Sequence, residues 1–297
     1  MTSQSKSYIY ACLSVLAWST VATAFKLTLS ATGFLQMLFY ASLTSLITYI
    51  LILTANGEII KLKYLSGREV LNSAVLGFLN PYLYYLVLFR AYSLLQAQEA
   101  LVLNYTWAIV VVVLSIIVLG QKISIVNIIS LLVSFFGVVI IATKGKITSI
   151  NLDEPFGVAL ALGSSLIWGL YWVLNVRDRR EAVVKLLLNF LFGTFYITIT
   201  IIISGESFRV NSGESLLGCL YIGLFEMGIT FIFWLKALQY SKTTARVSNL
   251  IYLSPFMSLI LIAVVLKEGI FFSSIIGLIL VIAGIVLQQF KINVRNN

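Results

Sequence analysis

The chain is a succession of apolar stretches, each close to the length that crosses a bilayer. Its 297 residues are 60% hydrophobic and 10% charged, and a helix needs about 20 predominantly apolar residues to span the hydrocarbon core. We predict ten spans, at residues 8–28, 33–54, 70–91, 97–119, 124–143, 156–176, 183–203, 215–237, 243–266 and 271–290. The first is too long for a signal peptide, so we expect it to be retained. The predicted fold class is an all-α integral membrane protein in which the lipid bilayer is the main partner.

The distribution of basic residues predicts how the chain is oriented. If the N-terminus is cytoplasmic, six of the 20 lysines and arginines fall on the far side, Lys26, Arg90, Lys144, Lys146, Arg209 and Lys267, and the other fourteen on the cytoplasmic side. Cytoplasmic loops carry an excess of lysine and arginine, so both termini are predicted to be cytoplasmic. The net charge of +9 is therefore mainly a topology signal. Without a basic domain of its own, the chain is not expected to bind nucleic acid.

The reactive side chains of most enzymes are missing from this sequence. It contains no histidine, and both cysteines, Cys12 and Cys219, lie inside predicted spans. The lack of histidine excludes Ser/His and Cys/His catalysis and histidine-ligated metals. No metal site or cofactor is predicted, and an enzyme acting within the membrane is disfavoured.

The two halves of the chain repeat one another, at an offset of about 146 to 150 residues. Trp18 and Trp168 lie in register, LFRAYSLLQA from Leu88 matches WLKALQYSKT from Trp234, and SFFGVVI matches VIAGIVL. We predict two units of five helices, residues 1–148 and 149–297. Because five is odd, the second unit enters the membrane in the opposite direction, as in the inverted repeats of secondary transporters.

These features resemble the drug/metabolite transporter superfamily, and in particular its EamA-type members. The likeness rests on the two five-span units, the tryptophan of each opening helix, the Arg/Lys-Ala step before each fourth helix and LKEG at 266–269. Within that group, LAWST at 16–20, Glu99 followed by NYTW at 104–107, and GQK at 120–122 are similar to bacterial aromatic amino acid exporters. The resemblance implies export of an amino acid or related metabolite by alternating access.

Two positions depart from that pattern. Ala108 stands where the exporters commonly carry proline, and Glu226 stands where they would show a small or hydroxyl residue. Both lie in helices that we assign to a cavity wall, so the substrate is the least transferable part of the resemblance. Glu268 matches a glutamate of the family and is assigned a structural role.

Polar and aromatic residues that share one helical face are the candidates for a substrate site. They are Trp18, Tyr84, Asn104, Tyr105, Trp107, Trp168, Tyr171, Trp172, Asn175, Glu226, Thr230, Asn249 and Tyr252. By its depth in the predicted span, Trp234 fits an interfacial belt better than a site, as do Tyr64 and Tyr240. Trp107 and Trp168 lie deeper, where a site and a belt are equally compatible with the sequence.

Glu226 is the most informative candidate, because it is the sole Asp, Glu, Lys or Arg in LLGCLYIGLFEMGITFIFWL. A charge at bilayer depth costs roughly 2.5 to 3.5 kcal/mol on insertion scales, so such a residue usually faces a cavity or a partner. It is predicted to attract a substrate ammonium or to carry a coupled proton, with Glu99 as a second coupling candidate. A structural reading leaves it protonated and bonded to a neighbouring helix.

Three functions remain compatible with these observations. The first is a carrier for a small-molecule substrate, an amino acid or amine; the second is a carrier for another metabolite, such as a nucleoside or a cationic compound. The third is a membrane-embedded subunit that does not transport. The cytoplasmic membrane is the expected location, and both a monomer and a homodimer are compatible with the sequence.

Overall fold

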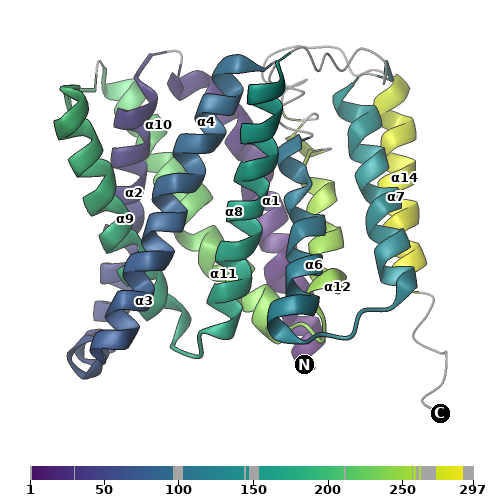
Figure 1. Cartoon of the computed structure of the whole chain (residues 1–297), viewed down its shortest axis with the longest axis horizontal. Coiled ribbons are helices and arrows are strands. Elements are labelled where there is room, and N and C mark those ends of the chain that lie inside the picture. Colours follow the sequence, from purple (N-terminus) through teal and green to yellow (C-terminus); the bar gives the residue numbers. More distant parts are fainter. Residues whose placement is uncertain are drawn as a thin grey trace.

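A computed structural model describes residues 2–29, 31–95, 103–143, 145–146, 154–210, 212–255, 257–258, 261 and 272–289. Over these residues the protein is built from helices, without a β-strand (Figure 1). In the first half of the chain the helices are α1 (Ser3–Leu29), α2 (Phe34–Ala55), the short 3₁₀ helix η1 (Ile59–Tyr64), α3 (Gly67–Gly77), η2 (Phe78–Leu83), α4 (Tyr84–Leu94), α6 (Trp107–Leu119) and α7 (Ile125–Ala142). In the second half they are α8 (Pro155–Arg177), α9 (Ala182–Ser204), α10 (Gly213–Ile222), η4 (Gly223–Gly228), α11 (Ile229–Tyr240), α12 (Thr244–Ser248), η5 (Asn249–Tyr252) and α14 (Phe272–Gln289).

Six of the described helical segments are long and apolar enough to cross a membrane: Ser3–Leu29, Phe34–Ala55, Gly67–Ala91, Pro155–Arg177, Ala182–Ser204 and Gly213–Tyr240. Leu103–Leu119, Ile125–Ile140 and Ile275–Leu287 are shorter apolar helices. Large apolar side chains cover the outer faces, including Ile203 at 82% exposure and Ile117 at 73%. In water such a surface would be unfavourable, so it identifies the outside of the bundle as the lipid-facing side.

The sequence suggested that the third and eighth spans are continuous α-helices, but in the structure they are not. Each is interrupted near its middle by a π-helical turn, η2 between α3 and α4 and η4 between α10 and α11. Pro81 explains the first interruption, because proline has no N–H and clashes with the preceding turn. No proline lies in the second, where Gly223 and Gly228 bound the turn. The ninth predicted span, 243–266, lies partly outside the described residues.

In the main helix pairs, a helix from the first half of the sequence packs against a helix from the second half. α1 lies along α11 and α4 lies along α8; α2 lies along α9, and α7 pairs with α14 (Figure 1). Glycines permit the closest approaches, since a Cβ on Gly77 would collide with the backbone of α9, and one on Gly223 with the backbone of α2. The core is therefore formed between the halves rather than within each of them.

Candidate functional site

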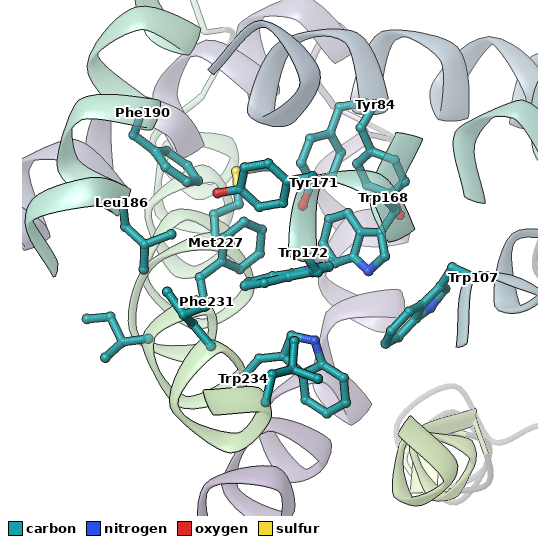
Figure 2. Close-up of a cluster of buried hydrophobic side chains, with 14 of the residues drawn as sticks. Tyr84, Trp107, Trp168, Tyr171, Trp172, Leu186, Phe190, Met227, Phe231 and Trp234 are labelled. Atoms are coloured by element: carbon teal, nitrogen blue, oxygen red, sulfur yellow. The ribbon is translucent and has the colours of Figure 1, made fainter. Parts of the chain in front are cut away.

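The five tryptophans of the chain, four of them buried and Trp18 partly buried, lie in one group, which we call the tryptophan cluster. Trp18 comes from α1. Trp107 comes from the start of α6, Trp168 and Trp172 from α8, and Trp234 from α11 (Figure 2). The ring centroids of Trp18 and Trp234 are 5.4 Å apart, those of Trp107 and Trp234 are 5.6 Å apart, and those of Trp168 and Trp172 are 5.6 Å apart. Both halves of the sequence contribute, so the cluster marks the interface between them.

Tyrosines and a phenylalanine extend the cluster. Tyr84 lies 4.3 Å from Trp168 between ring centroids, Tyr171 lies 5.2 Å from Trp172, and Phe231 lies 5.0 Å from Trp172. Most of these pairs are tilted or edge-to-face, the arrangement that the ring quadrupoles favour. The result is a wall of aromatic faces and edges with few polar atoms (Figure 2).

Three indole N–H groups in this wall are buried donors without a partner. The Nε1 atoms of Trp168, Trp172 and Trp234 have no hydrogen-bond acceptor among the described residues, although these side chains are 3%, 0% and 0% exposed. A buried donor left unpaired costs about 1 to 3 kcal/mol. An acceptor group of a bound small molecule would satisfy these donors. In Figure 2 the indole nitrogens of Trp168 and Trp234 point into the cluster rather than away from it.

The carboxyl group of Glu226 lies beside the tryptophan cluster. Glu226 belongs to η4 and is 8% exposed. The Tyr85 hydroxyl donates to its Oε1 at 2.9 Å, and the Trp18 indole donates to its backbone carbonyl at 3.2 Å. The ring of Tyr85 is in turn 6.4 Å from that of Trp168. The Glu226 carboxyl is therefore connected to the aromatic wall through Tyr85.

Helix α2 holds the η4 turn in position. The Ser45 hydroxyl donates to the Gly223 carbonyl at 2.7 Å, and the Tyr49 hydroxyl donates to the carbonyls of Met227 at 2.5 Å and Gly228 at 3.1 Å. A π-helical turn frees carbonyls that an α-helix would pair internally, and in a bilayer such groups need a partner within the protein. The side chains of α2 meet this need, so the backbone of Glu226 is fixed from two sides.

Of the other predicted site residues, Asn104 joins the wall. It accepts a hydrogen bond from the Tyr84 hydroxyl at 3.4 Å and donates to Ser164 at 3.0 Å. Tyr105 packs against the core at its margin.

Three other predicted site residues, Thr230, Tyr252 and Asn175, have hydrogen bonds or ring contacts with residues other than Glu226 and the tryptophans. The Thr230 hydroxyl, in α11, donates to the carbonyl of Phe225 in the preceding η4 turn. Tyr252 contacts Phe135 at 6.2 Å, and Asn249 is buried in η5, next along the chain. Asn175 belongs to a separate polar group described below. Glu99 lies outside the described residues.

The assignment of Trp234 to an interfacial belt was wrong. Its side chain is fully buried and contacts Trp18 and Trp107. The depth argument assumed a span ending at residue 237, whereas α11 continues to Tyr240 and packs along α1. Tyr240 and Tyr64, at 38% and 80% exposure, do lie on the surface.

Tyr85 is the site residue that the sequence did not identify. In a continuous helix, Tyr85 would lie on a different face from Asn80 and Tyr84, which are four residues apart. The interruption at Asn80 and Pro81 changes the register between α3 and α4, and Tyr85 thereby faces Glu226 across the interface of the two halves. Two adjacent tyrosines after a proline were the available signal.

A second buried polar group, the loop network, connects α8 and α9. It consists of Asp178, Arg180 and Lys185. Lys185 is fully buried and donates to the backbone carbonyls of Asn175 and, at 2.6 Å, Asp178, at the C-terminal end of α8 where carbonyls lack helical partners. Arg180 pairs with Asp178 at 2.5 Å. Asn189 joins the group by donating to Asn175 at 3.1 Å.

The charges of the loop network act on Asp178. Partial burial raises the pKa of this carboxyl, but the hydrogen bonds and the positive charge of Arg180, together with Lys185, outweigh burial and hold the pKa below its usual range. Asp178 is therefore ionised at neutral pH.

The apolar helical bundle, together with the comparisons that follow, identifies the class as a multi-span membrane transporter rather than an enzyme. The chain belongs to the EamA-like transporter family, whose model matches twice, at residues 5–143 and 155–288. A relative in Clostridium kluyveri is 27% identical over 95% of this chain and 93% of its own length, and one in Archaeoglobus fulgidus is 27% identical over 76% and 78%. Both are named as uncharacterized transporters. A solved crystal structure, 20% identical, superposes with a TM-score of 0.82 over 96% of this chain and 97% of its own, which shows a shared fold.

Proposed function

We propose that this transporter carries an amino acid or a related amine metabolite across the cytoplasmic membrane, in the direction of export. The observation that supports the proposal is the buried Glu226 carboxyl, which accepts a hydrogen bond from Tyr85, whose ring lies 6.4 Å from that of Trp168 in the tryptophan cluster. Aromatic faces attract cations through their ring quadrupoles, by about 0.5 to 2 kcal/mol, and the carboxylate adds a charge partner for an ammonium group. The unpartnered indole donors suit an acceptor at the other end of a zwitterion.

The proposed architecture is two inverted units of five helices, residues 1–148 and 149–297, with both termini in the cytoplasm. The packing supports it, because α1 against α11 has its counterpart in α8 against α4, and α2 against η4 in α9 against η2. The two helix interruptions also correspond: Phe78–Leu83 and Gly223–Gly228 are offset by 145 residues, close to the offset of the sequence repeat.

The mechanism follows from where the site lies. Because the tryptophan cluster is assembled from both halves, a movement of one half against the other separates its rings and opens the path to one side. Closing the rings around the solute and reopening them on the opposite side would give alternating access. Glu226 is the proposed coupling residue as well as the counter-charge, with Glu99 as a second candidate.

Proteoliposomes that contain only this protein test the function. We expect uptake or release of at least one member of a panel of amino acids and amines, measured against liposomes without protein. Movement of nucleosides or permanently cationic compounds, but of no amino acid or primary amine, would replace the proposed substrate class. Failure to move any solute would leave a non-transport subunit as the better account.

A further inference from the structure

Tyr85 contacts Glu226 through its hydroxyl group, which a phenylalanine would lack. Its side chain is fully buried, and its hydroxyl lies 2.9 Å from Glu226 Oε1. The ring packs against Tyr84 at 4.7 Å and Phe89 at 5.7 Å, so the side chain is held by neighbours on its own helix. This packing orients the hydroxyl of Tyr85 toward the carboxyl group of Glu226.

This hydrogen bond joins the two halves of the chain. Tyr85 lies in α4 of the first half and Glu226 in η4 of the second. The backbone of Glu226 is fixed separately, by the Trp18 indole at its carbonyl and by α2 at the neighbouring carbonyls. Among the described side chains, Tyr85 is the donor that reaches the carboxyl group itself.

We propose that Tyr85 is a positioning residue, which holds the Glu226 carboxylate in place to bind the substrate. A carboxylate has two acceptor oxygens, and Tyr85 occupies Oε1, so that the group is held in one rotamer and Oε2 is left to accept from the substrate ammonium. The proposal rests on the proposed function, in which Glu226 binds an amine. It differs from that function in assigning a role to a residue that does not itself bind the charge.

The chain offers a control in Tyr196 of α9, which lies outside the site. Its side chain is half-buried, and its hydroxyl donates to the backbone carbonyl of Ala74 at 3.3 Å. Tyr85→Phe and Tyr196→Phe each remove one hydroxyl and keep the ring. If the Tyr85 bond only stabilised the fold, neither variant would change substrate affinity in the folded protein.

Binding can be measured without knowing the transport rate. Because all five tryptophans lie in the cluster, a ligand that binds there changes the intrinsic fluorescence of the protein. The probe is the amino acid or amine that the wild-type protein transports in proteoliposomes. We expect Tyr85→Phe to raise the Kd and KM by about tenfold with less than a twofold change in kcat, as for one lost hydrogen bond to a charged group. Tyr196→Phe should remain within twofold of the wild type.

A double variant shows whether Tyr85 acts through Glu226. In a Glu226→Gln protein, adding Tyr85→Phe should produce no further loss of binding, because the carboxylate that Tyr85 positions is gone. Independent tenfold losses would overturn the proposal. If Tyr85→Phe does not fold, Glu226→Asp serves instead, because its shorter side chain keeps the charge but moves it away from the Tyr85 hydroxyl. An unchanged KM in Glu226→Asp would also overturn the proposal.

The outcomes separate this proposal from the function on which it rests. If the wild-type protein transports no amine, both are wrong. If it transports an amine and Tyr85→Phe has the wild-type KM, the role of Tyr85 is wrong and the proposed function stands.

Discussion

Replacing Asp178 with asparagine should destabilise the protein far more than the loss of an exposed charge. In the wild type the Asp178 and Arg180 side chains are 8% and 9% exposed, and the guanidinium makes two contacts to Asp178 Oδ2, at 3.0 and 2.5 Å, and one to Oδ1, at 3.1 Å. Asp178→Asn keeps the shape and leaves the Arg180 charge buried without its counter-ion. Breaking a buried pair from one side costs about 3 to 5 kcal/mol.

The assay is the free energy of unfolding in mixed micelles, followed by tryptophan fluorescence. The matched control is Glu58→Gln, which removes the acid of the ion pair with Lys61, whose side chains are 31% and 44% exposed. Exposed pairs contribute about 0 to 1 kcal/mol, so this variant should be close to the wild type. Equal losses in Asp178→Asn and Glu58→Gln would refute the reasoning, because burial would then have no effect on the cost.

The same pair predicts a dependence on pH. Since the pKa of Asp178 is lower in the folded protein than in the unfolded chain, its contribution is fully present above the unfolded pKa of about 4. It is lost as the pH falls through the lower, folded pKa. The stability difference between the wild type and Asp178→Asn should therefore be constant from neutral pH to about pH 5 and shrink in stronger acid.

Two further sets of substitutions test the packing and the site. Gly223→Ala should destabilise the protein by about 1 to 3 kcal/mol, because the new Cβ meets the backbone of α2; Gly163→Ala, with nothing within 4 Å of its Cβ, should stabilise it slightly or leave it unchanged in the same unfolding assay. Trp168→Ala and Trp234→Ala should each weaken substrate binding, measured by fluorescence, by about tenfold or more, whereas Phe156→Ala, at 62% exposure on the surface of α8, should not. A loss confined to Trp168→Ala would mean that Trp234 is structural.

Several features of the candidate site follow from the sequence, because a bilayer limits the length of a spanning helix and makes a buried charge costly. Apolar length locates the spans, and a helical period places Trp168 and Trp172 on one face. The register between the halves pairs Trp18 with Trp168, and the structure puts these two indoles 6.2 Å apart. The cost of a mid-span charge made Glu226 informative before any contact was known.

The contacts that depend on interrupted helices could not be predicted. Periodicity assumes a continuous helix, and η4 contains no proline to signal a break. Tyr85, the partner of Glu226, was therefore not identified. Thr230 was assigned to the site, although its hydroxyl donates to a carbonyl that the π-helical turn frees.

The burial of Lys185 also escaped prediction. A lysine near a span end usually extends its ammonium to water. In this protein the α8–α9 connection folds back, so that the ammonium is enclosed by carbonyls at the end of α8. A hydropathy profile contains no information on which way a connection turns.

The most direct test of the central claim is transport by Glu226→Gln in proteoliposomes, with Glu214→Gln as the control. Glu214 is an exposed acid in the first turn of α10, in the same membrane-length helical segment, Gly213–Tyr240. If the Glu226 carboxylate binds the substrate amine or couples its movement, Glu226→Gln folds, inserts and loses transport, whereas Glu214→Gln transports like the wild type. Wild-type kinetics in Glu226→Gln would contradict the account.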